Sequence, residues 1–182
     1  MNEPTILVTG ATGQVGFELV RALQGLARVV APDRSMLDLS DGKRLATVVR
    51  EIQPSIIINP AAYTAVDQAE SDADAAMRVN ATAPGVLAAE ARHIGATLIH
   101  YSTDYVFDGT KNAPYNEDDP VGPLNVYGAS KLAGERAIED AGCAYVVLRT
   151  SWVYGMRGRN FLRTMLRLAE ERPELRIVAD QI

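Results

Sequence analysis

The chain has 182 residues and a formal net charge of -5, with 47% hydrophobic and 23% charged residues. This composition is close to the globular average, so it excludes a mainly disordered chain and predicts one domain with a real core. The acidic balance argues against general nucleic-acid binding, which needs a basic face.

Three further features indicate where the protein works and which metal sites it lacks. No apolar run approaches the roughly 20 residues of a membrane span, and the segment 1–4 lacks the features of a signal peptide. A single cysteine, Cys143, excludes an intramolecular disulfide framework and a cysteine-based zinc site. Two histidines are too few for most histidine-based metal centres. We expect a soluble protein of a reducing compartment, the cytoplasm, with no membrane partner.

Apolar segments of strand length alternate with segments of helical periodicity along the chain. Consecutive apolar residues at 56–58 are typical of a parallel strand covered on both faces. This alternation predicts an α/β fold with a doubly wound, mostly parallel sheet of the Rossmann type. We expect strands at 6–8, 29–31, 56–58, 97–101, 145–148 and 175–178, helices at 14–26, 45–52, 71–94 with an irregularity at Pro84-Gly85, 128–140 and 160–171, and a long functional loop over 108–124.

Three glycines at a spacing of three follow the first expected strand and open the first helix: Gly10, Gly13 and Gly16. Such glycines allow a sharp turn and a close approach to a pyrophosphate, while the helix N-terminus offers free N–H groups to the phosphates. Gln14 and Val15 lie in the same turn. The position of the pattern favours a dinucleotide site over a purely structural turn.

The second expected strand is followed by Asp33 and Arg34, twenty residues after the glycine turn. An acidic residue there accepts hydrogen bonds from an adenosine ribose, whereas an arginine pairs with a 2′-phosphate. The two residues point to different cofactors, NADH and NADPH, and the alternative is an exposed turn. Asp38 and Leu39 are candidates for contacts with the adenine side.

Tyr127 and Lys131 are four positions apart at the start of the helix expected at 128–140, so they share one face. A phenol has a pKa of about 10, and a nearby ammonium lowers it toward the range useful for acid–base catalysis. Alone, such a pair is usually a surface feature. Its place in a sheet with a dinucleotide turn favours a catalytic role.

Ser102 and Thr103 lie at the carboxyl end of the strand expected at 97–101, where ligands bind in open α/β sheets. Either hydroxyl would hydrogen-bond a substrate carbonyl and help Tyr127 polarise it, and the sequence does not separate them. The alternative is a helix cap or a turn.

Together these features resemble the extended short-chain dehydrogenase/reductase superfamily. Four segments narrow the resemblance to the dTDP-4-dehydrorhamnose reductase family: NPAAYTAVD at 59–67, YSTDYVF at 101–107, NVYG at 125–128 and RTSWVYG at 149–155. The resemblance covers nearly the whole chain. The second and fourth segments are far more specific than the glycine turn.

The resemblance implies reduction of the C4 ketone of dTDP-4-dehydro-L-rhamnose to dTDP-L-rhamnose with a hydride from NADPH or NADH. Tyr127 would donate the proton, Lys131 would lower its pKa and hold the nicotinamide ribose, and Thr103 would bind the reacting oxygen. Asp104 and Trp152 would contact the nucleotide-sugar substrate. The positions expected to line the cofactor are Gly10, Gly13, Gln14, Val15, Gly16, Asp33, Arg34, Asp38, Leu39, Ala62, Tyr63, Thr64, Tyr101, Tyr127 and Lys131.

Two departures from the family concern the chain end and the metal. The family's chains run on into a smaller C-terminal region that completes the sugar pocket and takes part in dimer contacts. We therefore interpret residues 1–182 as an NAD(P)-binding Rossmann domain from the N-terminal portion of a longer chain, with a homodimer as the candidate assembly. The resemblance alone brings Mg²⁺ into consideration. Asp118-Asp119 and Glu170-Glu171 are typical of solvated charges, so no metal ligands are assigned.

Two other functions remain as alternatives. One is a non-catalytic NAD(P)-binding protein of the same fold, as in the regulatory subunit of methionine adenosyltransferase. The other is a nucleotide-sugar epimerase or dehydratase, which retains NAD⁺ through its cycle. The joint presence of Thr103, Tyr127 and Lys131 favours an enzyme, and a dehydratase would need carboxylates beyond Asp104.

Overall fold

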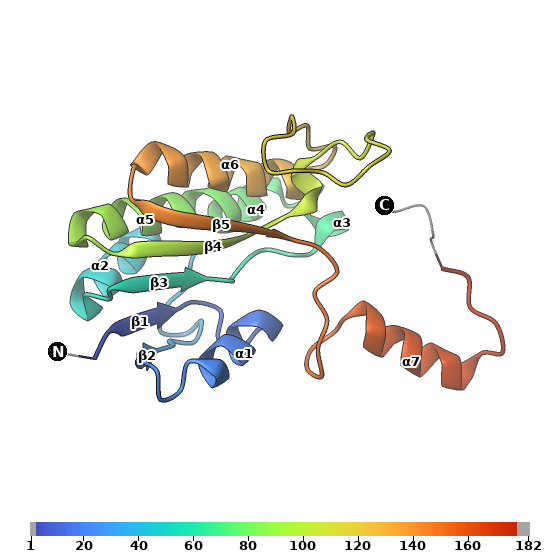
Figure 1. Ribbon diagram of the computed structural model, residues 1–182, viewed down its shortest axis with the longest axis horizontal. Coiled ribbons are helices and arrows are strands. Elements are labelled where there is room, and N and C mark those ends of the chain that lie inside the picture. The colour runs from blue at the N-terminus through green and yellow to red at the C-terminus, as the bar shows by residue number, and fades with distance from the viewer. Residues whose placement is uncertain (1–2, 178–182) are drawn as a thin grey trace.

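A computed structural model describes residues 3–177 and shows a parallel sheet between layers of helices (Figure 1). The sheet order is β2-β1-β3-β4-β5, and every pair of neighbouring strands is parallel. This is the predicted Rossmann-type arrangement. Its elements are β1 (Thr5–Val8), α1 (Gln14–Ala22), β2 (Arg28–Val30), α2 (Gly42–Ile52), β3 (Ile56–Asn59), α3 (Val66–Ala69), α4 (Ala73–Met77), a π-helical turn (Arg78–Thr82), α5 (Ala83–Ile94), β4 (Thr97–Thr103), a 3₁₀ turn (Asp104–Val106), α6 (Val126–Ala141), β5 (Ala144–Thr150) and α7 (Phe161–Glu171).

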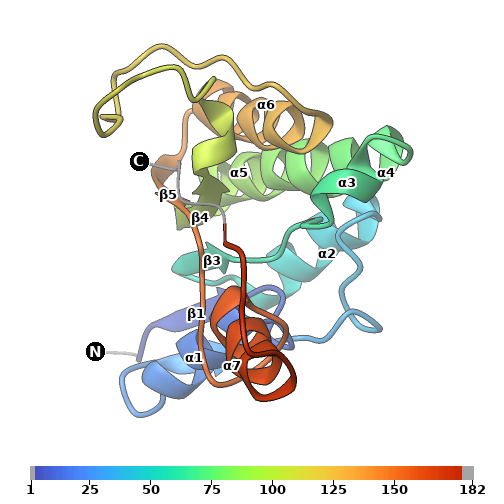
Figure 2. The same ribbon diagram turned by 90° about the vertical axis from the view of Figure 1, so that its right-hand side faces the viewer.

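Strands β1, β3 and β4 are central, and their side chains alternate between two apolar layers. Leu7, Ile57 and Leu98 enter the larger core cluster, which includes side chains of α2, α5 and α6. Val8 and Ile58 point to the other face and pack with α1. Both faces of the central strands are therefore covered, as the consecutive apolar residues of β3 predict. Figure 2 shows α5 and α6 on one side of the sheet and α1 on the other.

The long helix expected over 71–94 is divided into α4, the π-helical turn and α5. The predicted irregularity is present, but it lies at 78–82, just before Pro84-Gly85. Proline lacks an N–H donor, and its ring clashes with the carbonyl four residues earlier in a regular helix. The wider turn accommodates that carbonyl, which belongs to Asn80.

Two further expectations differ from the structure. Helix α1 ends at Ala22 and not at 26, because the chain turns there and Gly25 adopts a left-handed φ of 79°. Residues 175–177 form no strand, and Val178 lies outside the described residues. A strand exists only as part of a ladder, and no described strand pairs with the outer edge of β5.

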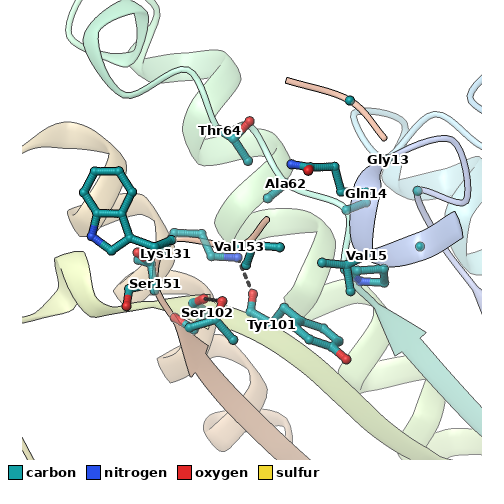
Figure 3. A pocket seen from close by; sticks show the side chains of 18 of the residues that line it. Gly13, Gln14, Val15, Ala62, Thr64, Tyr101, Ser102, Lys131, Ser151 and Val153 are labelled. Carbon is teal, nitrogen blue, oxygen red and sulfur yellow. Dashed lines mark hydrogen bonds between the residues drawn. The ribbon is translucent and has the colours of Figure 1, made fainter. Parts of the chain in front are cut away.

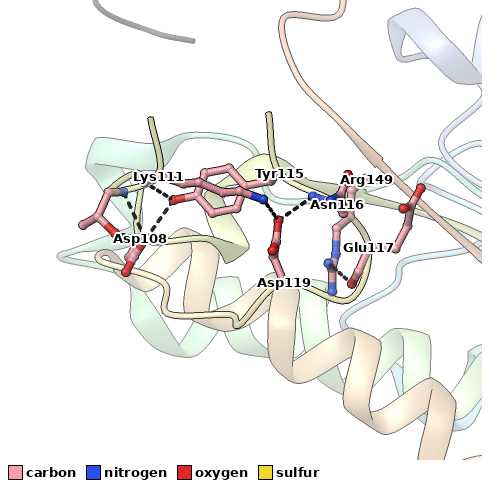
Figure 4. A network of polar contacts seen from close by, with 8 residues as sticks. Asp108, Lys111, Tyr115, Asn116, Glu117, Asp119 and Arg149 are labelled. Atoms are coloured by element: carbon pink, nitrogen blue, oxygen red, sulfur yellow. Dashed lines mark hydrogen bonds and ion pairs between the residues drawn. The ribbon is translucent and has the colours of Figure 1, made fainter. Parts of the chain in front are cut away.

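The loop over 108–124 is confirmed as a loop, and polar contacts fix its shape (Figure 4). Asp108 accepts a hydrogen bond from the Tyr115 hydroxyl at 2.8 Å, and Lys111 forms an ion pair with Asp119. Arg149 of β5 forms a bidentate pair with Glu135 of α6, donates to a loop carbonyl, and lies over the Phe107 ring. The loop is therefore tied to β5 and, through Glu135, to α6, which carries Lys131.

Candidate active site

Two adjacent cavities open at the carboxyl ends of the strands, with volumes of about 790 and 390 Å³. They share Gly10, Thr12, Ala61 and Ala62, so the two cavities adjoin, and we call them together the hollow. Every site residue expected from the sequence lines one of the two cavities. The larger holds Gly10, Gly13, Gln14, Val15, Gly16, Ala62, Thr64, Tyr101, Thr103, Asp104, Tyr127, Lys131 and Trp152; the smaller holds Asp33, Arg34, Asp38, Leu39 and Tyr63.

Two glycines of the turn lie where a side chain would not fit. Gly10 has a left-handed φ of 57°, and a Cβ on it would lie 2.8 Å from the Cβ of Ala61. A Cβ on Gly16 would lie 2.2 Å from the Gly10 carbonyl oxygen. Gly13 is the N-cap of α1 and provides no side-chain cap, so the first N–H groups of the helix remain available to an anion. Figure 3 shows this turn and the loop at 62–64 bordering the same space.

The smaller cavity carries charges of both signs. The Asp33 carboxylate accepts hydrogen bonds from the backbone N–H and hydroxyl of Ser35 and from the N–H of Met36, and these lower its pKa. The guanidinium of Arg34 is largely exposed and lies 3.6 Å from the Asp38 carboxylate. These residues fit the adenosine half of a dinucleotide. Both Asp33 and Arg34 border this cavity, so it offers a group for the ribose of NADH and another for the 2′-phosphate of NADPH.

Thr103 and Tyr127 meet at the other end of the larger cavity. The Thr103 hydroxyl donates to Asp104 at 3.0 Å and accepts from the N–H of Tyr105 at 3.2 Å, so it also caps the 3₁₀ turn. The Thr103 side chain is also near enough to the Tyr127 phenol to act on its pKa. The ring of Tyr105 packs edge-on against Tyr127 at 5.6 Å. The catalytic and capping interpretations of Thr103 are therefore compatible.

The pKa of Tyr127 differs from the expectation that Lys131 lowers it. Burial raises this pKa, the Thr103 hydrogen bond acts in the opposite direction, and the charges of Asp104 and Tyr105 raise it further. Lys131 has no part in the shift, because its amino group is directed to β4. The raised pKa keeps the Tyr127 phenol protonated at neutral pH, which is the state that a proton donor needs.

Lys131 is 1% exposed, and burial lowers its pKa to about 8. Its Nζ donates to the Tyr101 carbonyl at 2.6 Å (Figure 3). The same Nζ lies 3.2 Å from His100 Nε2. An ammonium has three N–H donors, so these two partners leave a third for a ligand in the cavity.

The loop that carries Ala62, Tyr63 and Thr64 is held by Asn80 of the π-helical turn. The Asn80 amide accepts from the N–H of Tyr63 at 2.8 Å and donates to the Tyr63 carbonyl at 3.0 Å. The same amide donates to the Ser130 hydroxyl, next to Lys131. One buried side chain thus fixes the loop relative to α6.

Trp152, expected from the resemblance, lies just after β5, and the segment beyond it carries cavity residues that the sequence interpretation missed. Trp152 has a left-handed φ of 50°, an unusual conformation for a bulky residue that often marks a functional site. Asn160 donates to the Gln14 side chain at 2.8 Å, which places the segment 157–159 beside the glycine turn. The available signals were the RTSWVYG segment at 149–155 and the position of β5 next to β4. The cavity residues not expected individually are Thr12, Pro60, Ala61, Val66, Tyr105, Thr150, Ser151, Val153, Arg157, Gly158 and Arg159.

Ser102, the residue that the sequence did not separate from Thr103, is 4% exposed and lines the larger cavity. Within residues 3–177 its hydroxyl is the buried side-chain polar atom with no hydrogen-bond partner. An orphaned hydroxyl that borders the same cavity as the glycine turn and Lys131 is consistent with a ligand site there.

Comparison with protein families gives a match over residues 4–182 to the RmlD substrate binding domain. The chain belongs to this family. It is 57% identical over 176 residues to the dTDP-4-dehydrorhamnose reductase of Burkholderia thailandensis, covering 97% of the chain and 59% of that protein. The corresponding protein of Escherichia coli K12 is 49% identical over 180 residues, with 97% and 60% covered.

Solved structures agree with this assignment. A dTDP-4-dehydrorhamnose reductase from Bacillus anthracis in complex with NADP has a TM-score of 0.90 and 41% identity, covering 94% of this chain and 61% of that one. A UDP-glucose 4-epimerase from Thermus thermophilus in complex with NAD has a TM-score of 0.76 and 26% identity, covering 85% and 57%. The chain therefore spans about 60% of the length of the reductases that it matches.

The structure also bears on a metal ion and on the membrane. Among residues 3–177, no group of three or more His, Cys, Asp or Glu side chains is placed to hold a metal ion. In the same part of the chain, no helix is both long and apolar enough to cross a membrane.

Proposed function

We propose that this chain carries the cofactor site and the proton donor of a reductase that converts dTDP-4-dehydro-L-rhamnose to dTDP-L-rhamnose with NADPH or NADH. The observation that carries this proposal is that the larger cavity is lined both by the glycine turn and by Thr103, Tyr127 and Lys131. The names of the similar reductases, and the NADP in one of their structures, support it.

The residues of the hollow fit a dinucleotide along its whole length. The glycine turn and the N-terminus of α1 would bind the pyrophosphate, and Asp33 or Arg34 would contact the adenosine ribose or its 2′-phosphate. The third N–H of Lys131 would bind the nicotinamide ribose. The bound cofactor would supply the hydride.

The chemistry assigned to the chain is proton donation to a ketone oxygen. The hydroxyls of Thr103 and Tyr127 would bind that oxygen, which gains negative charge as the hydride reaches the carbon. Tyr127 would then give its phenolic proton to the oxygen, so that the ketone becomes an alcohol. Burial favours the protonated phenol, and the neighbouring Thr103 side chain would help to keep the phenol in place until that moment. Asp104 and Trp152, at the same end of the cavity, would contact the sugar.

The test is a titration of the chain with NADPH and NADH followed by nicotinamide fluorescence, after which dTDP-4-dehydro-L-rhamnose is added. The proposal predicts binding, then oxidation of one cofactor for each sugar reduced, with the oxidised cofactor released. Retention of NAD⁺ with isomerisation of the sugar would indicate the epimerase alternative. Binding without oxidation, even after a C-terminal region is supplied, would indicate the non-catalytic alternative.

A further inference from the structure

A row of four buried polar side chains runs beneath the larger cavity from β1 to α6. The Thr9 hydroxyl donates to Asn59 Oδ1 at 2.5 Å, Asn59 Nδ2 lies 3.0 Å from His100 Nδ1, and His100 Nε2 lies 3.2 Å from Lys131 Nζ. Each of the four is 1% exposed or less. We call this row the Thr9–Lys131 chain. The proton transfer described above does not use its first three members.

The hydrogen-bond directions in the Thr9–Lys131 chain determine which imidazole nitrogen carries the proton. An amide nitrogen only donates, so Asn59 Nδ2 requires a lone pair on His100 Nδ1. A neutral imidazole with that lone pair carries its proton on Nε2, which faces Lys131. Burial holds the pKa of His100 well below its ordinary value, so the ring stays neutral. This arrangement therefore suits a neutral Lys131 amine, which accepts the Nε2 proton.

When Lys131 is charged, the hydrogen bonds along the chain of four side chains must run in the opposite direction. An ammonium has no lone pair, so Nε2 must accept and the imidazole proton must move to Nδ1. The Asn59 amide then turns over, so that its oxygen accepts from Nδ1–H and its nitrogen donates to the Thr9 hydroxyl. Both contacts survive this exchange, because the amide presents an oxygen and a nitrogen at equivalent positions. The second arrangement holds one proton more than the first, and that proton is on Nζ.

We propose that His100 is a positioning residue for Lys131, and that the Thr9–Lys131 chain switches between these two arrangements as Lys131 gains or loses its proton. In either state the imidazole gives Nζ a partner and, with the Tyr101 carbonyl, fixes where the remaining N–H groups point. The relevance of this to catalysis rests on the proposed function, whereas the switch itself does not need a cofactor.

The neighbours of Lys131 make His100 its decisive partner. The titratable and charged groups that face it are His100 from β4, and Glu135 and Tyr127 from α6. Glu135 favours the charged lysine but is bound bidentately by Arg149. Strand β3 contributes only the neutral Asn59.

The test is nitrogen-15 NMR of the imidazole groups in the chain without cofactor. The chain has two histidines, and His93 is exposed on α5, so a His93→Gln variant leaves the signals of His100 alone. The lysine pKa of about 8 sets the midpoint. We expect the Nδ1–H tautomer at about pH 6.5 and the Nε2–H tautomer at about pH 9.5, changing together with the Lys131 side-chain signal. One unchanged tautomer, or formation of an imidazolium ion in that range, would overturn the proposal.

An Asn59→Asp variant adds a measurement that would not change if His100 had only a structural role. A carboxylate only accepts, so it should hold the Nδ1–H tautomer at both pH values and raise the titration midpoint of Lys131 by about 1 unit or more. Asn112→Asp, which adds the same charge on an exposed loop, should change neither. An equal shift in both variants would show a general charge effect and refute the coupling. If Asn59→Asp does not fold, the pH series on the His93→Gln variant still tests whether the tautomer of His100 changes. A chain that switches but does not oxidise NADPH with dTDP-4-dehydro-L-rhamnose, even after a C-terminal region is supplied, would refute the proposed function alone.

Discussion

Gly134 of α6 lies directly against the backbone of Asn80: a Cβ atom at position 134 would stand 2.1 Å from the Asn80 carbonyl oxygen. That carbonyl belongs to the π-helical turn, and the side chain of the same asparagine holds the loop at Tyr63. The close approach therefore sets the distance between the cofactor-side loop and the helix that carries Tyr127 and Lys131.

Gly134→Ala should destabilise the fold, because the added methyl group must displace backbone. We expect a loss of about 2–3 kcal/mol in the free energy of unfolding, despite the better helix propensity of alanine. The control is Gly42→Ala at the start of α2, where the nearest atom to a new Cβ is 3.5 Å away. Urea unfolding of both variants measures the difference. Equal stability of the two would contradict the packing described for α6.

Ser102 and Ser130 are both buried serines, but substitution by alanine should affect the stability of the fold differently at the two positions. The Ser102 hydroxyl has no partner among the described residues, so Ser102→Ala should leave stability unchanged or raise it by about 0.5–1 kcal/mol. The Ser130 hydroxyl accepts from Asn80 and donates to the Tyr127 carbonyl, so Ser130→Ala should cost about 1–2 kcal/mol. Thermal unfolding without cofactor measures the change in stability of both variants. A larger loss for Ser102→Ala than for Ser130→Ala would refute the hydrogen-bond assignment.

Arg34→Ala should separate the two cofactors. The Arg34 side chain borders the smaller cavity and is largely exposed, so it is available to a 2′-phosphate. We expect NADPH binding to weaken by more than about tenfold, because a charge-assisted hydrogen bond is lost, with little change for NADH. Arg21→Ala, on the exposed surface of α1, serves as the control. Equal weakening of both cofactors would mean that Arg34 does not read the 2′-phosphate.

The buried Lys131 should make stability depend on pH in a defined window. Its pKa is lowered from 10.5 to about 8 in the folded chain, so between these values the unfolded chain binds more protons. The free energy of unfolding should therefore rise with pH across that window, by up to about 3 kcal/mol. Lys131→Met should lose this rise, whereas Lys43→Met on the surface of α2 should keep it. The same pH slope in all three proteins would show that Lys131 is not the group responsible.

Local patterns predicted the sheet, the glycine turn and the face shared by Tyr127 and Lys131, because each depends on residues close together in the chain. The strand at 175–178 was predicted from its apolar residues alone. For 175–177 that prediction was wrong, since a strand also needs a free neighbouring edge in the right place. The π-helical turn was expected only as an irregularity. Its position depends on packing against Gly134 as well as on Pro84.

The Thr9–Lys131 chain was not predictable from local pattern. Thr9 and Asn59 are 50 positions apart, and Asn59 and His100 are 41 apart. Neither spacing carries a periodic signal. His100 appeared only as a residue of an apolar strand, and the raised pKa of Tyr127 depends on burial that the sequence does not show.

The central claim is that Tyr127 donates the proton in a reduction whose cofactor lies in the adjoining hollow. The most direct measurement compares NADPH oxidation by dTDP-4-dehydro-L-rhamnose in a single turnover for the native protein, Tyr127→Phe and Tyr145→Phe. Tyr145 lies on β5 outside both cavities and is the matched control. The account predicts that Tyr127→Phe binds NADPH normally but oxidises it about 10²–10⁴ times more slowly, while Tyr145→Phe keeps the native rate. A native rate in Tyr127→Phe would contradict it.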